Sequence, residues 1–116
     1  MQYKLHQIHL TDAEVDQVNA EGHDSVHKQK LKLDMNFGDT PTVARQAMDL
    51  GYYNQVALIE ADSLEGVFHV GNVGPEEAIT RLKPMYSVSV GDVVEDEQGV
   101  QSVVASFGFK QLAPSN

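Results

Sequence analysis

Cysteine is absent from the chain of 116 residues. The protein can therefore hold neither a disulfide framework nor a thiolate metal site, and the absence is compatible with a reducing cytoplasm. No run approaches the ~18 apolar residues of a membrane span. The first ten residues alternate between polar and apolar types and lack the apolar core of a signal peptide. We therefore expect a protein of the cytoplasm that does not associate with a membrane.

Basic residues are also scarce. Eight Lys and Arg face seventeen Asp and Glu, which gives a net charge of −9. Binding to a phosphate backbone needs positive charge, so direct binding of DNA or RNA is disfavoured. An acidic surface suits a basic partner, including a protein that normally holds nucleic acid. The alternative interpretation is that the acidic surface only keeps the protein soluble.

The length predicts one domain over residues 1–112, with a C-terminal tail at residues 113–116 that frays. Hydrophobic residues make up 41% of the chain, which is enough to build one core. Short strand-like and helix-like segments alternate irregularly. This order predicts an α+β domain with a mostly antiparallel sheet of about five strands and three or four short helices.

The first strand and the first helix have separate local patterns. Apolar residues with polar spacers predict a strand near the N-terminus, and the spacing slips between Leu5 and Ile8, which predicts a bulge. Thr11 and Glu14 match a capping box, so we expect a short helix over residues 12–21.

Residues 30–37 alternate between polar and apolar types without a break and give the clearest strand pattern in the chain. The apolar face would consist of Leu31, Leu33, Met35 and Phe37. Three of the few basic residues would then form a positive edge, which guards a strand against edge-to-edge pairing. These are Lys28, Lys30 and Lys32.

The remaining elements follow from caps, turns and apolar runs. Thr40 as N-cap and Pro41 at the first helical position begin a helix that ends at Gly51, and residues 52–60 form a strand. A two-turn helix capped by Asp62 or Ser63 comes next. We further expect another short helix after Pro75, with Ile79 and Leu82 facing inward, and a hairpin of residues 93–94 and 100–105 closed by residues 96–99.

Candidate binding residues come from acidic stretches and from a pair of tyrosines. Paired tyrosines are good interface anchors, although core packing of one of them is an equal alternative. The candidates are Asp12, Glu14, Asp16, Glu60, Asp62, Glu65, Glu95, Asp96, Glu97, Tyr52 and Tyr53.

No pattern in the chain predicts catalysis. The carboxylates lie where caps, strand ends and turns favour acids, whereas a general acid needs a buried setting that raises its pKa. No serine lies in a nucleophile-elbow pattern. His23 and His27 are four residues apart, a spacing that can hold zinc, but a third ligand is missing and a solvated pair is the preferred interpretation. We expect a non-enzymatic protein with no metal and no cofactor.

The last quarter of the chain carries a resemblance. Ser-Val-Ser-Val-Gly-Asp-Val-Val at residues 87–94 is followed by a hairpin and by Val-Val-Ala-Ser-Phe-Gly-Phe at residues 103–109. This pattern resembles the ends of small phage proteins and the YodL-like segments of large proteins of conjugative elements. Residues 60–72 and 74–81 are similar to the same pattern, so the resemblance covers roughly residues 56–110. It implies an origin and no catalytic residue.

The resemblance implies a task in the host cell cytoplasm. Small acidic accessory proteins of phages and mobile elements include anti-CRISPR and anti-restriction proteins, and some are DNA mimics. We expect a protein that binds and inhibits a host protein with a basic nucleic-acid-binding surface. The alternative is a structural or regulatory phage domain that docks on phage proteins or on itself.

Overall fold

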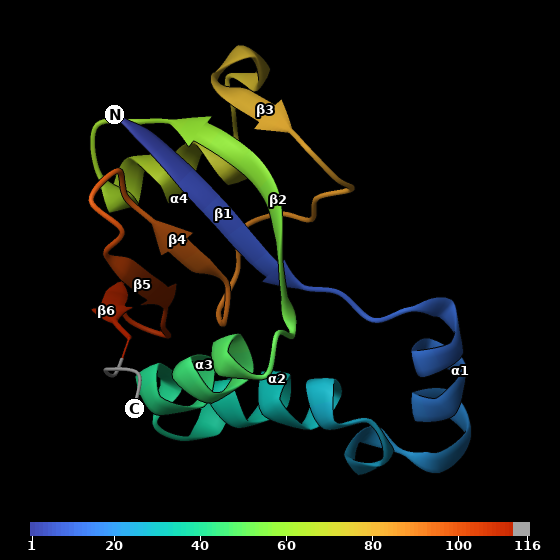
Figure 1. Ribbon diagram of the computed structural model, residues 1–116. Helices are drawn as coiled ribbons and strands as arrows, with labels where there is room; N and C mark the ends of the chain where they lie inside the picture. The colour runs from blue at the N-terminus through green and yellow to red at the C-terminus, as the bar shows by residue number, and fades with distance from the viewer. Residues whose placement is uncertain (113–116) are drawn as a thin grey trace.

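The computed structural model describes residues 1–112, and its centre is a six-stranded antiparallel sheet in the order β3-β2-β1-β4-β5-β6 (Figure 1). The α+β class and the antiparallel sheet predicted from the sequence are confirmed, with six strands and four α-helices. The strands are β1 (Gln2–Ile8), β2 (Tyr53–Glu60), β3 (Ile79–Arg81), β4 (Val93–Glu95), β5 (Gln101–Val104) and β6 (Phe109–Gln111). The helices are α1 (Asp12–Glu21), α2 (His27–Phe37), α3 (Thr40–Asp49) and α4 (Leu64–Asn72), with short 3₁₀ helices at η1 (His23–Ser25) and η2 (Glu76–Ala78).

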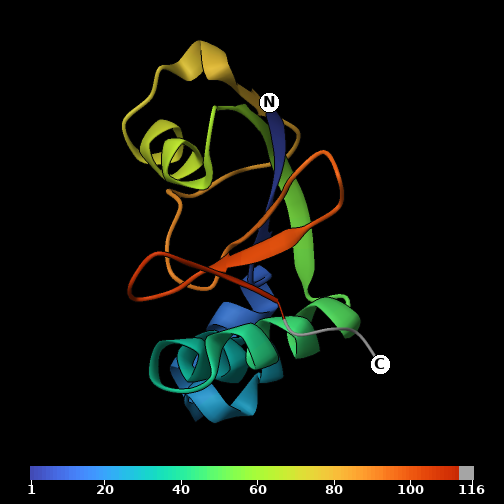
Figure 2. The ribbon, with the colours of Figure 1, turned by 90° about the vertical axis from the view of Figure 1, so that its left-hand side faces the viewer.

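Helices pack on both faces of the sheet. Successive residues of a strand point to opposite faces, and apolar residues on each face contact a different set of helices. Val94 belongs to a core cluster that includes Val67 of α4. Its neighbour Val93 belongs to a second cluster that includes Leu31 of α2 and Ala44 of α3. Figure 2 shows the result, with α4 beside the sheet and α1 to α3 gathered at one end.

The pairing of β1 is irregular after Leu5, at the position of the predicted bulge, but the extra residue lies on the neighbouring strand β2 and not on the first strand. Leu5 pairs with Ala57 and His6 pairs with Gln55, so Val56 of β2 is the extra residue. The carbonyl of Val56 accepts hydrogen bonds from the two backbone amides that follow β3. The bulge therefore joins the central strands to the chain that leaves the sheet edge.

The capping box of α1 is also confirmed. The Thr11 amide donates to the Glu14 carboxylate at 2.8 Å, and the Glu14 amide donates to the Thr11 hydroxyl at 3.2 Å. No residue of α1 is buried. The cap fixes the start of the helix, and the ion pair between Lys28 and Glu14, at 3.1 Å, links α1 to α2.

The strand predicted over residues 30–37 is wrong, because this segment is most of helix α2. Leu31 and Met35 are four residues apart and are both buried, whereas Phe37 is 88% exposed. In an alternating pattern, every second apolar residue is four positions from the first. Residues i and i+4 also share one face of a helix, so the alternating pattern fits a helix as well as a strand. The segment has no β-branched residue, and Leu, Lys and Met favour helices. The three lysines accordingly do not form a strand edge.

The helix predicted after Pro75 is reduced to the 3₁₀ turn η2, which leads directly into the edge strand β3. Ile79 packs inward, as predicted. Leu82 is 52% exposed and does not. The predicted helices at α3 and α4 and the hairpin of β4 and β5 are confirmed, with Asp39 rather than Thr40 at the cap of α3 and Ser63 at the cap of α4.

Candidate functional site

Two of the three predicted acidic stretches come together at one end of the sheet. The start of α4 and the turn between β4 and β5 lie at the same end as the N-terminus (Figure 1). Between them lies Tyr3, which is 5% exposed. Its pKa is raised first by burial and then by the negative charges of Asp96, Asp62, Glu65 and Glu97. We call these four carboxylates the acidic end.

Two further predicted acids near this end are engaged within the chain. Glu60 forms an ion pair with the N-terminal amine of Met1, at 3.3 Å. Glu95 contacts His6 at 3.1 Å and Lys4 at 3.8 Å. Part of their charge is therefore offset. At the acidic end Asp62, Glu65 and Glu97 are exposed. In contrast, Asp96 Oδ1 accepts hydrogen bonds from the Gln98 and Val100 amides.

The third predicted stretch lies on α1, at the opposite end of the molecule (Figure 1). Its members are Asp12, Glu14 and Asp16. The pKa of Glu14 is lowered first by the Thr11 backbone amide and further by Lys28. Glu14 thus serves the helix cap, and the structure does not bring this stretch together with the other two.

The two tyrosines have different surroundings. The Tyr53 hydroxyl donates to the carbonyl of Gly91, and burial raises the pKa of this phenol. Tyr53 therefore fastens β2 to the loop before β4. The partly buried Tyr52 contacts His27 Nδ1 through its hydroxyl at 2.8 Å, with the two rings edge to face. The role of either tyrosine in binding a partner stays a prediction.

The histidine pair is divided between separate contacts. His27 contacts Tyr52, and His23 Nδ1 lies 3.4 Å from the side-chain amide of Gln29. Across residues 1–112, no group of three or more His, Asp or Glu side chains is arranged to hold a metal ion.

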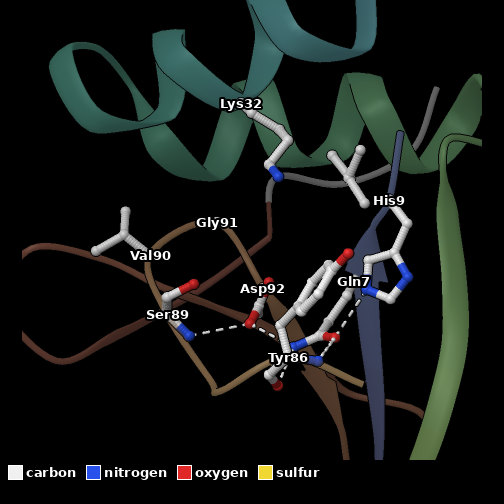
Figure 3. Close-up of a pocket in the computed structure, with 9 residues that line it drawn as sticks. Gln7, His9, Lys32, Tyr86, Ser89, Val90, Gly91 and Asp92 are labelled. Carbon is white, nitrogen blue, oxygen red and sulfur yellow. Dashed lines mark hydrogen bonds between the residues drawn. The ribbon is translucent and has the colours of Figure 1, made fainter. Parts of the chain in front are cut away.

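A buried polar network that the sequence analysis missed joins β1 to the loop before β4 (Figure 3). Gln7 is 2% exposed. Its amide nitrogen donates to Asp92 Oδ2 at 3.0 Å and to the carbonyl of Tyr86 at 2.9 Å, and its oxygen accepts from the Tyr86 amide at 3.0 Å. His9 Nε2 completes the set at 3.0 Å from the same oxygen. A signal was present, because Gln7 continues the buried face of Tyr3 and Leu5 with a polar side chain.

The loop at the other side of this network uses the turn chemistry expected of its sequence. Gly91 has φ of +95°, a backbone conformation that favours glycine. Asp92 Oδ2 accepts a hydrogen bond from the Ser89 amide at 2.9 Å. Asp92 therefore holds its own turn while it contacts Gln7, and the Val-Gly-Asp-Val-Val segment fixes the loop to the central strand.

Burial dominates the electrostatics of this network. It raises the pKa of Asp92 from 3.8 to about 6, against the opposing effects of the Ser89 amide, Gln7 and the Lys32 charge. It also lowers the pKa of His9, with a smaller contribution from Lys32. The cavity beside these groups is about 50 Å³, which is room for water and not for a substrate.

We expect Asp92→Asn to change how stability depends on pH. The folded pKa of Asp92 lies above its unfolded value, so its protonation stabilises the fold at low pH and this stabilisation is lost as the pH rises through about 6. The free energy of unfolding of the wild type should therefore fall relative to the variant between pH 4 and 8, by at most about 3 kcal/mol.

The measurement is urea unfolding at several pH values, with Asp16→Asn on exposed α1 as the control. His6 and His9 have lowered pKa values and act in the opposite direction, since they cost stability as the pH falls. Both histidines are present in wild type and variant, so the difference between the two isolates Asp92. Parallel pH profiles would show that the carboxylate is not perturbed in this way.

Comparison of the chain with protein-family models, with curated proteins and with solved structures found no match. Within residues 1–112, no helix combines the length and the apolar character that crossing a membrane requires. The fold and the surface together define a small acidic α+β protein, with a charged end built from two distant segments.

Proposed function

We propose that this protein is a non-enzymatic accessory protein of a phage or mobile element that binds a host nucleic-acid-handling protein and inhibits it. The acidic end would contact the basic surface with which the host protein holds nucleic acid. The observation that carries the proposal is that two distant acidic segments lie at the same end of the sheet (Figure 1): the start of α4, with Asp62 and Glu65, and the turn after β4, with Asp96 and Glu97.

Electrostatics support binding at this end. Charges within a Debye length of about 8–10 Å act together on a partner, and a surface of one sign attracts the opposite sign and excludes the same sign. The whole chain carries a net charge of −9. Carboxylates here would replace phosphates on the lysines and arginines of the partner, in the manner of an acidic DNA mimic.

The arrangement of the carboxylates favours binding over catalysis. Asp62 and Glu97 are exposed, where a general acid would gain no raised pKa from burial. Within residues 1–112, the carboxyl group whose pKa is strongly raised is that of Asp92, which accepts hydrogen bonds from Gln7 and Ser89 beside a cavity of about 50 Å³. Small-molecule sites typically occupy about 300–1,000 Å³.

The test is charge reversal at the acidic end. The double variant Asp62→Lys/Glu97→Lys should weaken the complex about tenfold or more, because two attractions become repulsions. A matched control is Asp16→Lys/Glu21→Lys on α1, which changes the net charge equally and should bind almost as the wild type does. Both pairs of side chains are exposed, so neither variant disturbs the core.

The measurement is capture from a nuclease-treated bacterial lysate at low and high salt, with identification of the bound proteins. We expect nucleic-acid-binding proteins whose capture falls with salt and with added DNA. Binding that is unaffected by salt and by the reversal would contradict the proposal. Recovery of phage proteins alone from infected cells would favour the alternative, an accessory domain that docks on phage proteins.

A further inference from the structure

An apolar groove of about 250 Å³ lies between α4 and the turn that joins β5 to β6, which share one side of Figure 2. Phe68 of α4 forms one wall, and Val104, Ala105 and Phe109 form the other. Phe68 is 43% exposed although it is a large apolar residue. Phe68 therefore adds exposed apolar surface beside the groove.

The rim of the groove adds an aromatic side chain that is almost free of contacts. Phe107 is 93% exposed and lies in the turn between Ser106 and Gly108, two residues that line the groove. Gly108 has φ of +76°, which sets the tight turn that presents Phe107. Because the turn already fixes the backbone around Phe107, a partner that covers this side chain loses little free energy to the ordering of the loop.

The groove also borders an edge of the sheet, because β6 is the last strand in the order that residues 1–112 form. The Ala105 amide donates to Gly108, and the Leu112 amide donates to Gln101. Since hydrogen-bonded pairs alternate along antiparallel strands, the backbone groups of Phe109 point away from β5. An extended segment can bond to such an edge while its side chains enter the adjoining groove.

The charge of the residues that line the groove indicates which kind of peptide segment could bind there. Glu65 forms part of the wall and also belongs to the acidic end. Lys110 pairs with Val103, and Val103 faces α2 and α3. The Lys110 side chain therefore lies on the face of the sheet opposite to the groove. Among the groove-lining residues the charge is thus negative.

We propose that this groove binds an extended segment of the partner protein that carries an aromatic or large aliphatic side chain next to Lys or Arg. The apolar side chain would lie between Phe68 and Phe109, and the basic side chain would pair with Glu65. The inference rests on the proposed function and specifies the chemistry of its partner.

The test begins with a displayed library of random peptides selected on the full chain. We expect enrichment of sequences in which an aromatic or large aliphatic residue adjoins Lys or Arg. A synthetic peptide of that consensus should bind Phe68→Ser at least tenfold more weakly and Glu65→Gln several-fold more weakly than wild type. Phe37→Ser removes an equally apolar side chain that is 88% exposed on α2, and it should bind as wild type does.

A second readout keeps a folding defect apart from a binding defect. The peptide should shift the backbone amide NMR signals of residues 104–109 in wild type, and the free Phe68→Ser variant should retain dispersed signals elsewhere. The proposal that the groove binds an extended segment would be contradicted if the library enriched no sequence, or if the peptide bound a folded Phe68→Ser variant with full affinity.

The failures of the two proposals are distinguishable. One outcome is a set of basic peptides that bind Asp62→Lys/Glu97→Lys more weakly but bind Phe68→Ser as they bind the wild type. This result would contradict binding in the groove and would remain consistent with binding at the acidic end. Lysate capture that ignores salt and the double reversal, while peptides still depend on Phe68, would overturn the acidic end and leave the groove. Peptide affinity that ignores salt and Glu65→Gln would overturn the basic residue specified for the groove.

Discussion

Replacement of Gln7 by Met should lower the free energy of unfolding by about 3 kcal/mol. The two side chains have similar length, so the change removes hydrogen bonds and leaves little cavity. Asp92 would lose its side-chain donor in a buried setting, and an unsatisfied buried group costs about 1–3 kcal/mol, more when it is charged. The backbone amide and carbonyl of Tyr86 would lose their partner as well.

Urea unfolding followed by circular dichroism measures this loss. Gln46→Met on the exposed face of α3 is the matched control and should change stability by less than about 0.5 kcal/mol. If the ionised Asp92 carries most of the cost, Gln7→Met should be more harmful at pH 8 than at pH 5. The double variant with Asp92→Asn should then lose less than the sum of the single changes. A loss no greater than that of the control would show that the network is not structural.

Leu31→Ala should lower the free energy of unfolding by about 2–4 kcal/mol, because this side chain is 3% exposed between the sheet and α3. Leu33→Ala should cost clearly less, since Leu33 is only partly buried. Phe37→Ala should cost less than about 0.5 kcal/mol, since Phe37 is 88% exposed.

This ranking distinguishes a helix from the strand that alternation alone predicts. In a strand the three residues would share one buried face, and their truncation would cost similar amounts. Unfolding curves of the three variants in urea provide the comparison. Equal losses at Leu31, Leu33 and Phe37 would contradict the helix.

Local chemistry explains which elements could be predicted from the sequence. The capping box of α1, the Ser63 cap of α4 and the turn between β4 and β5 depend on side chains that bond to backbone within a few residues. Residues 30–37 lack such a marker. Their pattern fits both a strand and a pair of helical positions. Helix propensity and packing of Leu31 and Met35 with α3 together favour the helix, and the packing partner is not specified by local sequence.

The site was predictable only in part, for the same reason. Its acidic residues stand out in the sequence, but their grouping depends on β1 lying between β2 and β4. The partners Gln7 and Asp92 are 85 residues apart. A polar residue in line with Tyr3 and Leu5 indicates a buried contact without naming the partner.

The central place of β1 has a consequence for how the chain folds. Its strand partners are residues 53–60 on one side and residues 93–95 on the other. The strand β1 therefore pairs along one edge only once residues 53–60 are present, and along its other edge only once residues 93–95 are present. Long-range pairing of this kind slows folding and leaves the strand exposed to other chains in the meantime. We expect the docking of the β4–β5 hairpin on β1 to be the step that completes the centre of the sheet, because β4 supplies the second neighbour of β1.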